Sequence, residues 1–399
     1  MSSPLVVLIL SLLLGVQPVT TDLYLPALPA ITDGFGASMA QAQLTLSGLL
    51  LAFGLSQLVW GPISDRFGRR PVLLVGLVAY TIAAIGSAFA PSMSLLIVWR
   101  IVQGAAMGAS VMCARAIVRD LYTPEAGARA MSKGLSGLGV IACLSTPLGG
   151  LLSDLFGWHA ALLALALFAA VTLAVVVLHF EETVRTPNLR ALEPLTLLRT
   201  WIHILRNPTF WAFALLAMMS YGGLFTFLAA SSFVFIKIMG LSKTVYGALM
   251  FSMSAAYLGG TVMCRRLLKR FGVHRTVAIG GVFSLVGGTS LGVLALLGVE
   301  SVWAIMVPVY LFMLGHGVHQ PCGQSGAIGP FPQAAGAASA LSGFLMMLSA
   351  FGMGHWLGTH MDGTVLPLTN GIWFWGVMTA AVAWGLVLRI RPDSPRVAD

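Results

Sequence analysis

The stretch Gly61-Pro62-Ile63-Ser64-Asp65-Arg66-Phe67-Gly68-Arg69-Arg70-Pro71 joins two long apolar segments of this 399-residue chain. Glycine permits backbone turns that other residues resist, and Gly61 and Gly68 favour a tight turn here. Four charged side chains within this stretch would be costly in hydrocarbon, which places the turn outside a membrane. The stretch therefore predicts two helices that meet at one face of a bilayer.

The composition of the whole chain agrees with a membrane protein. Hydrophobic residues make up 58% of the sequence and charged residues only 9%, with 45 glycines. A soluble domain carries roughly 25% charged residues, so a water-facing surface cannot be built from this chain. The formal net charge of +9 is a signal of membrane topology, because the soluble basic face that nucleic-acid binding needs is absent.

Glycine and proline divide the chain into apolar segments of about 18–25 residues, the length that a helix needs to cross hydrocarbon. We predict twelve transmembrane helices. Their expected ranges are 4–27, 41–63, 71–90, 93–116, 131–155, 158–180, 208–236, 244–264, 274–297, 302–325, 333–358 and 369–389.

Basic residues gather in alternate connections between these segments. They occupy 64–70, 115–133, 181–206, 265–275 and the tail from 389, whereas the other connections hold only Lys237 and Lys243. By the positive-inside rule, this asymmetry places both termini in the cytoplasm.

A long polar connection divides the twelve segments into six and six. We expect an N-terminal bundle at 1–180, an amphipathic cytoplasmic linker at 181–206, and a C-terminal bundle with a short tail at 207–399. The Arg66-Phe67-Gly68 core of the first turn recurs as Arg270-Phe271-Gly272 in the second half. The predicted fold is all-α and integral to the membrane, with two pseudo-symmetric six-helix bundles.

The charges of the 61–71 turn predict a conformational latch. Asp65 is placed to face a helix N-terminus of the other half, and Arg69 is placed to bridge Asp65 to Asp120. Such contacts hold the two halves together at the cytoplasmic face. The residues of this latch are Gly61, Asp65, Arg69 and Asp120.

At this point the sequence resembles the major facilitator superfamily, whose signature is the 61–71 turn. Trp99-Arg100-Ile101-Val102-Gln103-Gly104 is similar to the arginine motif of that family. Pro147-Leu148-Gly149-Gly150 is similar to its antiporter motif, with Thr146 where the motif usually has glycine. The stretches Thr21 to Pro29 and Ala114 to Tyr122 resemble the Bcr/CflA branch of bicyclomycin and chloramphenicol resistance proteins.

This resemblance implies a proton-coupled drug antiporter. Some drug antiporters carry a second acid about two turns before the position of Asp22, but that position is Leu14 in this sequence. A single embedded acid favours exchange of one proton for each substrate.

Asp22 is the candidate proton carrier. From Leu5 to Pro29 it is the only ionisable side chain apart from Tyr24, and an acid in a membrane segment indicates function. Arg100 lies about 10 Å below the outer surface and Asp22 about 8 Å, by helical rise. We therefore expect an Asp22–Arg100 pair that separates with conformation or substrate. Interfacial placement without a coupling role is the alternative for each residue.

Four polar residues in the spans are candidates for substrate binding: Tyr24, Gln103, Tyr221 and His319. Tyr24 would equally serve as a hydrogen-bond partner of a neighbouring helix. His316 and His319 titrate near neutrality and suit a proton relay, although packing is the more frequent role of a helix histidine. Methionines and aromatic residues of the second half, such as Met253 and Phe225, would form an adaptable apolar pocket.

Other functional classes lack the residues that they require. The four cysteines have no paired spacing, so neither a disulfide nor a metal site is expected. No cluster of ligands or catalytic triad indicates an enzyme, and a passive channel needs a polar lining along several helices. Protons are the only expected coupling species, and no cofactor is expected.

The sequence thus predicts a monomeric, multi-pass protein of the bacterial inner membrane. We expect proton-coupled efflux of small amphipathic drugs, amphenicol-like or bicyclomycin-like, by alternating access. Export of an endogenous small metabolite by the same mechanism is the alternative.

Overall fold

A computed structural model describes residues 3–122, 124–184 and 191–390 of the chain. Every regular element within these ranges is a helix. Residues 185–190 of the predicted linker and residues 391–399 of the predicted tail lie outside the described residues.

The N-terminal half contains α1 to α7. The bounds of its helices are α1 Ser3–Asp22, η1 Leu25–Ala27, α2 Leu28–Gly34, α3 Met39–Phe67, α4 Arg69–Ala88, α5 Met93–Leu121, α6 Pro124–Phe156 and α7 Trp158–His179. Ser38 caps α3 with a full capping box, and Ser92 caps α5 through its side chain. These caps satisfy backbone N–H groups that have no partner within the helix.

The second half follows a short helix within the predicted linker. That helix is α8, Pro194–Leu205, and the remaining bounds are α9 Pro208–Ser232, η2 Phe233–Ile238, α10 Lys243–Leu296, α11 Val302–Ile328, η3 Pro332–Ala334, α12 Ala335–His360, α13 Leu366–Gly385 and η4 Val387–Arg389.

Eleven helices of the described chain are long and apolar enough to cross a membrane. One of them, α10, has 54 residues and would be about 81 Å long if straight, far more than a bilayer is thick. Its backbone breaks at Gly272, where φ is 71°. α10 is therefore two spans that meet at Gly272, and the prediction of an all-α fold with twelve spans is confirmed.

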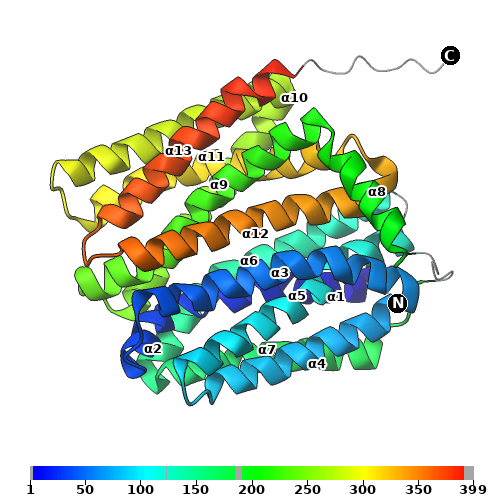
Figure 1. Cartoon of the computed structure of the whole chain (residues 1–399), viewed down its shortest axis with the longest axis horizontal. Helices are drawn as coiled ribbons and strands as arrows, with labels where there is room; N and C mark the ends of the chain where they lie inside the picture. The colour runs from blue at the N-terminus through cyan, green and yellow to red at the C-terminus, as the bar shows by residue number, and fades with distance from the viewer. Residues whose placement is uncertain (1–2, 123, 185–190, 391–399) are drawn as a thin grey trace.

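The long helices run roughly side by side from one end of the molecule to the other (Figure 1). The start of the chain, α8 and the end of α13 lie together at one end, which we call the linker end. The helix α2 lies at the other end of the long helices, which we call the opposite end (Figure 1).

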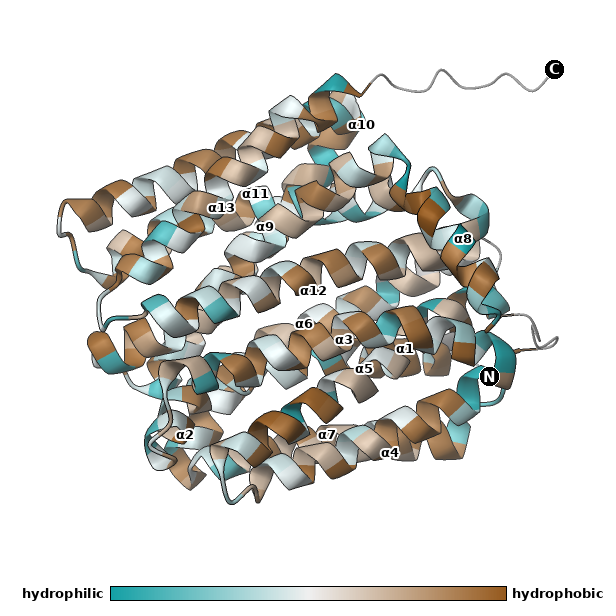
Figure 2. Ribbon diagram, viewed as in Figure 1, coloured by the Kyte–Doolittle hydropathy of each residue, from teal (hydrophilic) through white to brown (hydrophobic). Residues whose placement is uncertain are grey.

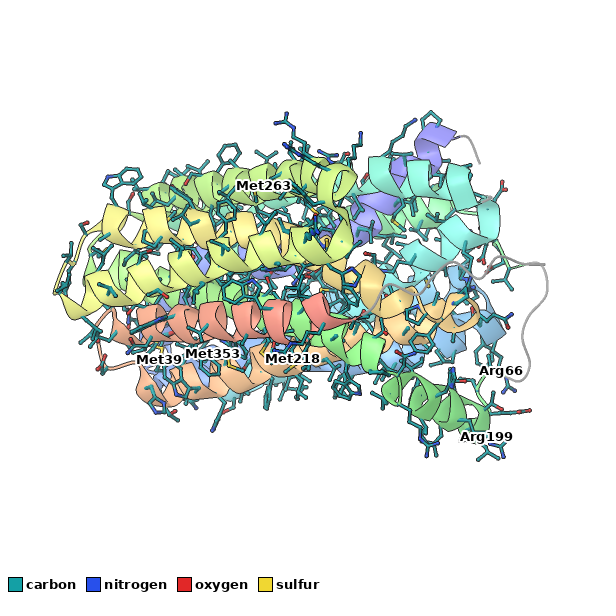
Figure 3. The ribbon with its side chains drawn as sticks, turned by 90° about the horizontal axis from the view of Figure 1, so that it is seen from above. Met39, Arg66, Arg199, Met218, Met263 and Met353 are labelled. Atoms are coloured by element: carbon teal, nitrogen blue, oxygen red, sulfur yellow. The ribbon has the colours of Figure 1, made fainter. Side chains whose placement is uncertain are left out.

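Polarity follows the same axis. Hydrophobic residues cover most of the long helices, and hydrophilic residues concentrate near α8 and at helix ends (Figure 2). Arg66 of α3 and Arg199 of α8 lie together at the linker end, whereas Met39, at the start of α3, lies toward the opposite end (Figure 3).

Close backbone contacts join the two halves at the opposite end. A Cβ atom on Gly150 would overlap the backbone oxygen of Lys243, and one on Gly247 would lie 2.7 Å from Pro147 Cα. On the α1 side, Gly149 packs against the backbone of Leu23. The predicted antiporter motif, Pro147, Gly149 and Gly150, therefore lies where α6 crosses both α1 and α10.

Polar contacts reinforce this closure. Lys237 forms an ion pair with Asp33, and Thr244 donates from its backbone N and its hydroxyl to Asp154, at 3.0 and 2.7 Å. Gln43 Nε2 donates to the carbonyl of Ala229 at 2.9 Å. Lys237 and Lys243 are the two lysines that interrupt the alternation of basic connections. Both of them contact acids of the N-terminal half.

We expect Gly150→Val to open the opposite end, because the new side chain overlaps the Lys243 carbonyl. Spin labels on Phe89→Cys and Leu297→Cys, in a background without the four native cysteines, would then report a longer distance by pulsed electron resonance.

Gly139→Val is the matched control for this prediction, because a Cβ on Gly139 of the same helix meets nothing within 4 Å. An unchanged distance in Gly150→Val would contradict the role of this contact in closing the halves.

Candidate functional site

A cavity of about 320 Å³ lies between the two halves. Its volume falls at the lower end of the range for small-molecule sites. The N-terminal half contributes residues of α1, α3, α5 and α6, and the C-terminal half contributes residues of α9 to α12. The polar side chains on its wall are Gln17, Thr21, Asp22, Gln57, Arg115, Tyr221, Ser254, Tyr257, His316, Gln320, Gln324, Ser339 and Ser342.

Asp22 is the only carboxylate among the residues that line this cavity. It is the last residue of α1, which carries Pro18 in its final turn and is followed by the short helix η1. Its carboxylate accepts a hydrogen bond from Thr21 Oγ1 at 2.8 Å. The end of the helix thus presents a carboxylate with one hydroxyl partner to the cavity.

Arg100 lies behind the cavity wall and is fully buried. Its guanidinium donates to Gln103 Oε1 at 2.7 Å and to the carbonyl of Thr20 at 3.0 Å. The same group stacks over the ring of Tyr24, with 4.2 Å from Cζ to the ring centroid. A fully buried arginine is tolerable when its donors and its face are occupied in this way.

The structure does not form the expected Asp22–Arg100 ion pair. Among the described residues, the two side chains make no contact with each other: Arg100 bonds to the carbonyls of Thr20 and Thr45, an amide and a ring, and Asp22 bonds to Thr21. The reason is local, because Arg100 reaches the backbone of Thr20, two residues before Asp22, and turns away from the cavity. Their roles in proton coupling stay predictions.

Of the four candidate substrate residues, Tyr221 lines the cavity. Tyr24 and Gln103 belong instead to the network of Arg100, and the hydroxyl of Tyr24 donates to Thr45 at 2.9 Å. His319 is buried away from the cavity, with Ser284 Oγ and the Val277 carbonyl within 3.4 Å. In this structure direct contact with a substrate is therefore open only to Tyr221.

The other histidine does reach the cavity. His316 Nδ1 lies 2.8 Å from Ser220 Oγ, and its ring packs against Tyr257 at 5.5 Å between centroids. Met313, His316, Gln320 and Gln324 of α11 all line the cavity. Their spacing of three and four residues defines one helix face. This periodicity was readable in the sequence, but His319 follows His316 by three residues, so the cavity lining itself is what separates the two histidines.

Several cavity residues were not among the candidates. Gln57 of α3 and Arg115 of α5 line its N-terminal wall, and Ser339 and Ser342 of α12 line the other. Met346 and Met347 add apolar surface, as do the expected Met253 and Phe225. Arg115 lies at the predicted end of a span, where a basic residue indicates membrane topology. It was therefore not recognised as a cavity residue.

The predicted latch residues form an ion-pair network at the linker end. Arg69 is 3% exposed, and it contacts Asp65 at 2.7 Å and Asp120 at 2.9 Å. The same guanidinium donates to Ser64 Oγ at 2.6 Å. Arg69 therefore bridges Asp65 and Asp120 as expected.

Two details of the latch differ from the prediction. Gly61 lies within α3, and the turn is made by Gly68, whose φ is 100°. Asp65 pairs with Arg69 and Arg119 of its own half. Among the described residues, no contact joins Asp65 to a helix of the C-terminal half, because the direct closure of the halves shown by the glycine contacts lies at the opposite end.

Glu182, which was not among the predicted site residues, completes this network. Its carboxylate accepts the backbone N–H groups of Arg69 and Arg70 at 2.9 Å, at the start of α4, and those of Thr183 and Val184. Burial raises the pKa of Glu182, but these four N–H groups lower it by more, so its pKa lies below the usual value. A carboxylate at a helix N-terminus also benefits from the helix dipole.

Two buried thiols also lie close together in the C-terminal half. Cys264 Sγ of α10 and Cys322 Sγ of α11 are 3.7 Å apart, and both are free. A disulfide requires about 2.05 Å. The described residues contain no group of three or more His, Cys, Asp or Glu side chains arranged to hold a metal ion.

These features define a class of protein: a multi-pass membrane transporter with two helical bundles and a binding cavity between them. Residues 10–354 match the sequence profile of the Major Facilitator Superfamily, and the chain belongs to that superfamily. The resemblance found in the sequence is thereby confirmed.

Several curated proteins resemble the chain over most of its length. Multidrug resistance protein D of Escherichia coli (strain K12) is 32% identical over 346 residues, which are 86% of each chain. The bicyclomycin resistance protein homolog of Haemophilus influenzae is 26% identical over 91% of each chain. A chloramphenicol resistance protein of Pseudomonas aeruginosa is 27% identical over 80% of this chain and 75% of its own length.

Solved structures share the fold. A D-xylose–proton symporter superposes with a TM-score of 0.75 over 96% of this chain and 97% of its own, at 16% identity. The E. coli xylose transporter XylE, in a partially occluded inward-open conformation, gives a TM-score of 0.74 over 98% of this chain and 100% of its own, at 13% identity.

We expect Glu182→Gln to lower the thermal stability of the purified protein at pH 7, by about 1 kcal/mol as for other helix caps. The pKa of Glu182 is lower in the folded chain than in the unfolded chain. Its contribution is therefore complete above the ordinary glutamate pKa of about 4.3, and it is lost as the pH falls through the folded value.

Tryptophan-fluorescence melts at pH 7 and pH 4 would measure this effect. The difference between the wild type and Glu182→Gln should shrink at pH 4. Glu181→Gln, at the exposed neighbouring position, should melt like the wild type at both pH values. Equal losses in the two variants would rule out the helix-capping role of Glu182.

Proposed function

We propose that this protein exports small amphipathic drugs, amphenicol-like or bicyclomycin-like, in exchange for protons. The single observation that carries the proposal is the cavity between the halves, where one carboxylate, Asp22, shares a wall with apolar and methionine side chains. Relatives named for multidrug, bicyclomycin and chloramphenicol resistance support the substrate class.

The chemistry of the exchange follows from the position of Asp22. The carboxylate accepts one hydroxyl donor and no cationic partner among the described residues, so a proton arriving through the cavity does not have to displace an ion pair. Protonation of Asp22 removes a charge that is costly in a membrane interior. Because the drug binds in the same cavity, drug binding and protonation of Asp22 compete with each other.

Alternating access requires the cavity to open to one side at a time. The glycine contacts and ion pairs at the opposite end separate the cavity from that side. We assign the linker end to the cytoplasm, because Arg66 and Arg199 lie there (Figure 3) and basic residues mark the cytoplasmic face. We accordingly propose that both termini lie in the cytoplasm and that the protein is a monomer in the bacterial inner membrane.

The energetics also favour coupling to a proton. Export of an uncharged drug in exchange for one proton moves one net charge inward, worth about 2.3 kcal/mol for each 100 mV of membrane potential. Asp22 is the one acid available on the cavity wall, in agreement with Leu14 at the place of a second acid.

We expect Asp22→Asn to abolish pH-gradient-driven transport of chloramphenicol and bicyclomycin in proteoliposomes, because the amide cannot carry the proton. The variant should still insert and should bind drug within a fewfold of the wild type. The matched control is Asp362→Asn, an exposed acid that accepts hydrogen bonds from Thr364 and lies outside the cavity lining. Normal gradient-driven transport by Asp22→Asn would exclude this coupling site.

Export of an endogenous metabolite remains the second candidate, because related carriers differ mainly in the side chains of the cavity. A growth-inhibition panel in a pump-deficient bacterial host distinguishes the two. A drug exporter raises the inhibitory concentration of its drugs at ordinary expression, whereas a metabolite exporter leaves the panel unchanged.

A further inference from the structure

Arg115 differs from the other cations of the protein interior. It lines the cavity from α5, fifteen residues beyond Arg100 and hence about 22 Å nearer the linker end. Arg69 has two carboxylate partners, and Arg100 is covered by Tyr24. Among the described residues, Arg115 has no carboxylate within ion-pair distance, and its one hydrogen bond is to Ser339 Oγ at 2.8 Å.

The guanidinium of Arg115 carries five N–H donors, so one hydroxyl contact leaves most of them to the cavity. A positive charge in this position is costly unless an anion or water meets it. The free N–H donors of Arg115 can therefore bind an anionic acceptor that enters the cavity from outside the protein.

Other hydrogen-bonding groups line the same part of the cavity. Ser342 is 2% exposed and its hydroxyl has no hydrogen-bond partner within the described part of the chain, and Gln57 is 3% exposed. Both belong to the linker side of their helices: Gln57 comes late in α3, which runs toward that end, and Ser342 comes early in α12, which starts there. The two halves therefore both supply donors around Arg115.

We propose that Arg115 forms an anion subsite of the cavity, and that the transporter accepts amphipathic organic anions such as aromatic carboxylates. This inference rests on the proposed function and specifies its substrate class. The carboxylate would bind at Arg115, Gln57 and Ser342, and the apolar body would extend along Met346 and Met347 toward the level of Asp22.

The charge pattern of the cavity supports this orientation. Asp22 repels an anionic group from the end of the cavity nearer the opposite side, and Arg115 attracts it at the linker side. The charged group of an anion therefore stays apart from the proton carrier. Exchange of a monovalent anion for one proton moves two net charges inward, so the membrane potential drives it more strongly than export of a neutral drug.

A purely conformational role for Arg115 is the alternative, because its bond to Ser339 joins the two halves. The Ser339→Ala variant removes that bond and keeps the guanidinium. If Arg115 acts only through the link between halves, Ser339→Ala and Arg115→Gln should have the same effect on ligand binding.

Calorimetric titration of the purified full-length protein in nanodiscs tests the subsite, with 2-naphthoate and its uncharged isostere 2-naphthamide as probes and empty nanodiscs as the blank. We expect the wild type to prefer the naphthoate by about tenfold, as one charge-assisted hydrogen bond provides. Arg115→Gln should lose this preference and keep its affinity for the naphthamide, which also shows that the variant is folded.

The matched variants sharpen the outcome. Arg115→Lys keeps the charge and should retain a reduced preference, and Ser339→Ala should retain the full preference. The proposal is overturned if the wild type shows no preference, if Arg115→Gln keeps it, or if Ser339→Ala loses it as fully as Arg115→Gln.

This experiment is independent of the proton-coupling test. A wild type that shows no naphthoate preference but intact proton-driven chloramphenicol transport would remove the anion subsite alone. A naphthoate preference in a protein that shows no proton-driven transport would remove the proposed antiport and leave the subsite in place.

Discussion

The cost of placing charge in hydrocarbon is the constraint on which the rest of this structure depends. A charged side chain within a membrane segment must be neutralised by partners or must face a cavity. Arg100 meets the first condition with Gln103, the Thr20 carbonyl and the ring of Tyr24. Asp22 and Arg115 meet the second, and these two residues define the chemistry of the cavity.

Close approach of backbones is the second physical device, and glycine provides it. Helices in a membrane gain little from hydrophobic association, so small residues that permit tight packing stabilise their contacts. Gly150 against Lys243 and Gly247 against Pro147 bring α6 and α10 together at the opposite end. The residues of the antiporter motif thus form the surface on which one half packs against the other.

The fold was predictable because its signals are local. Apolar length, alternation of basic connections and the repeated Arg-Phe-Gly core require no knowledge of tertiary contacts, and they gave twelve spans in two bundles. The break of α10 at Gly272 was equally local, since a second turn of the same type was expected there. Only the ends of the helices differ, as for α3, which starts at Met39 and ends at Phe67.

The cavity was less predictable, because membership depends on which way a helix face points. Tyr24, Gln103 and His319 are polar residues within spans, as are Gln57 and His316, and composition does not distinguish the two groups. Periodicity separates some of them, since Met313, His316, Gln320 and Gln324 share one face. Contacts between helices distant in sequence, such as Arg100 with Thr20, decide the rest.

Arg100 bonds to the end of the helix that carries Asp22, the proposed proton carrier, and does not pair with Asp22 itself. A carboxylate held in an ion pair with arginine would stay charged and would seldom bind a proton. In this structure Arg100 instead binds the carbonyl of Thr20, within the last turn of α1. It fixes the end of the helix that carries Asp22 while Gln103 and Tyr24 occupy its remaining surfaces. Among the described residues the carboxylate of Asp22 is thus left without an ion pair, which agrees with the proton-carrying role proposed for it.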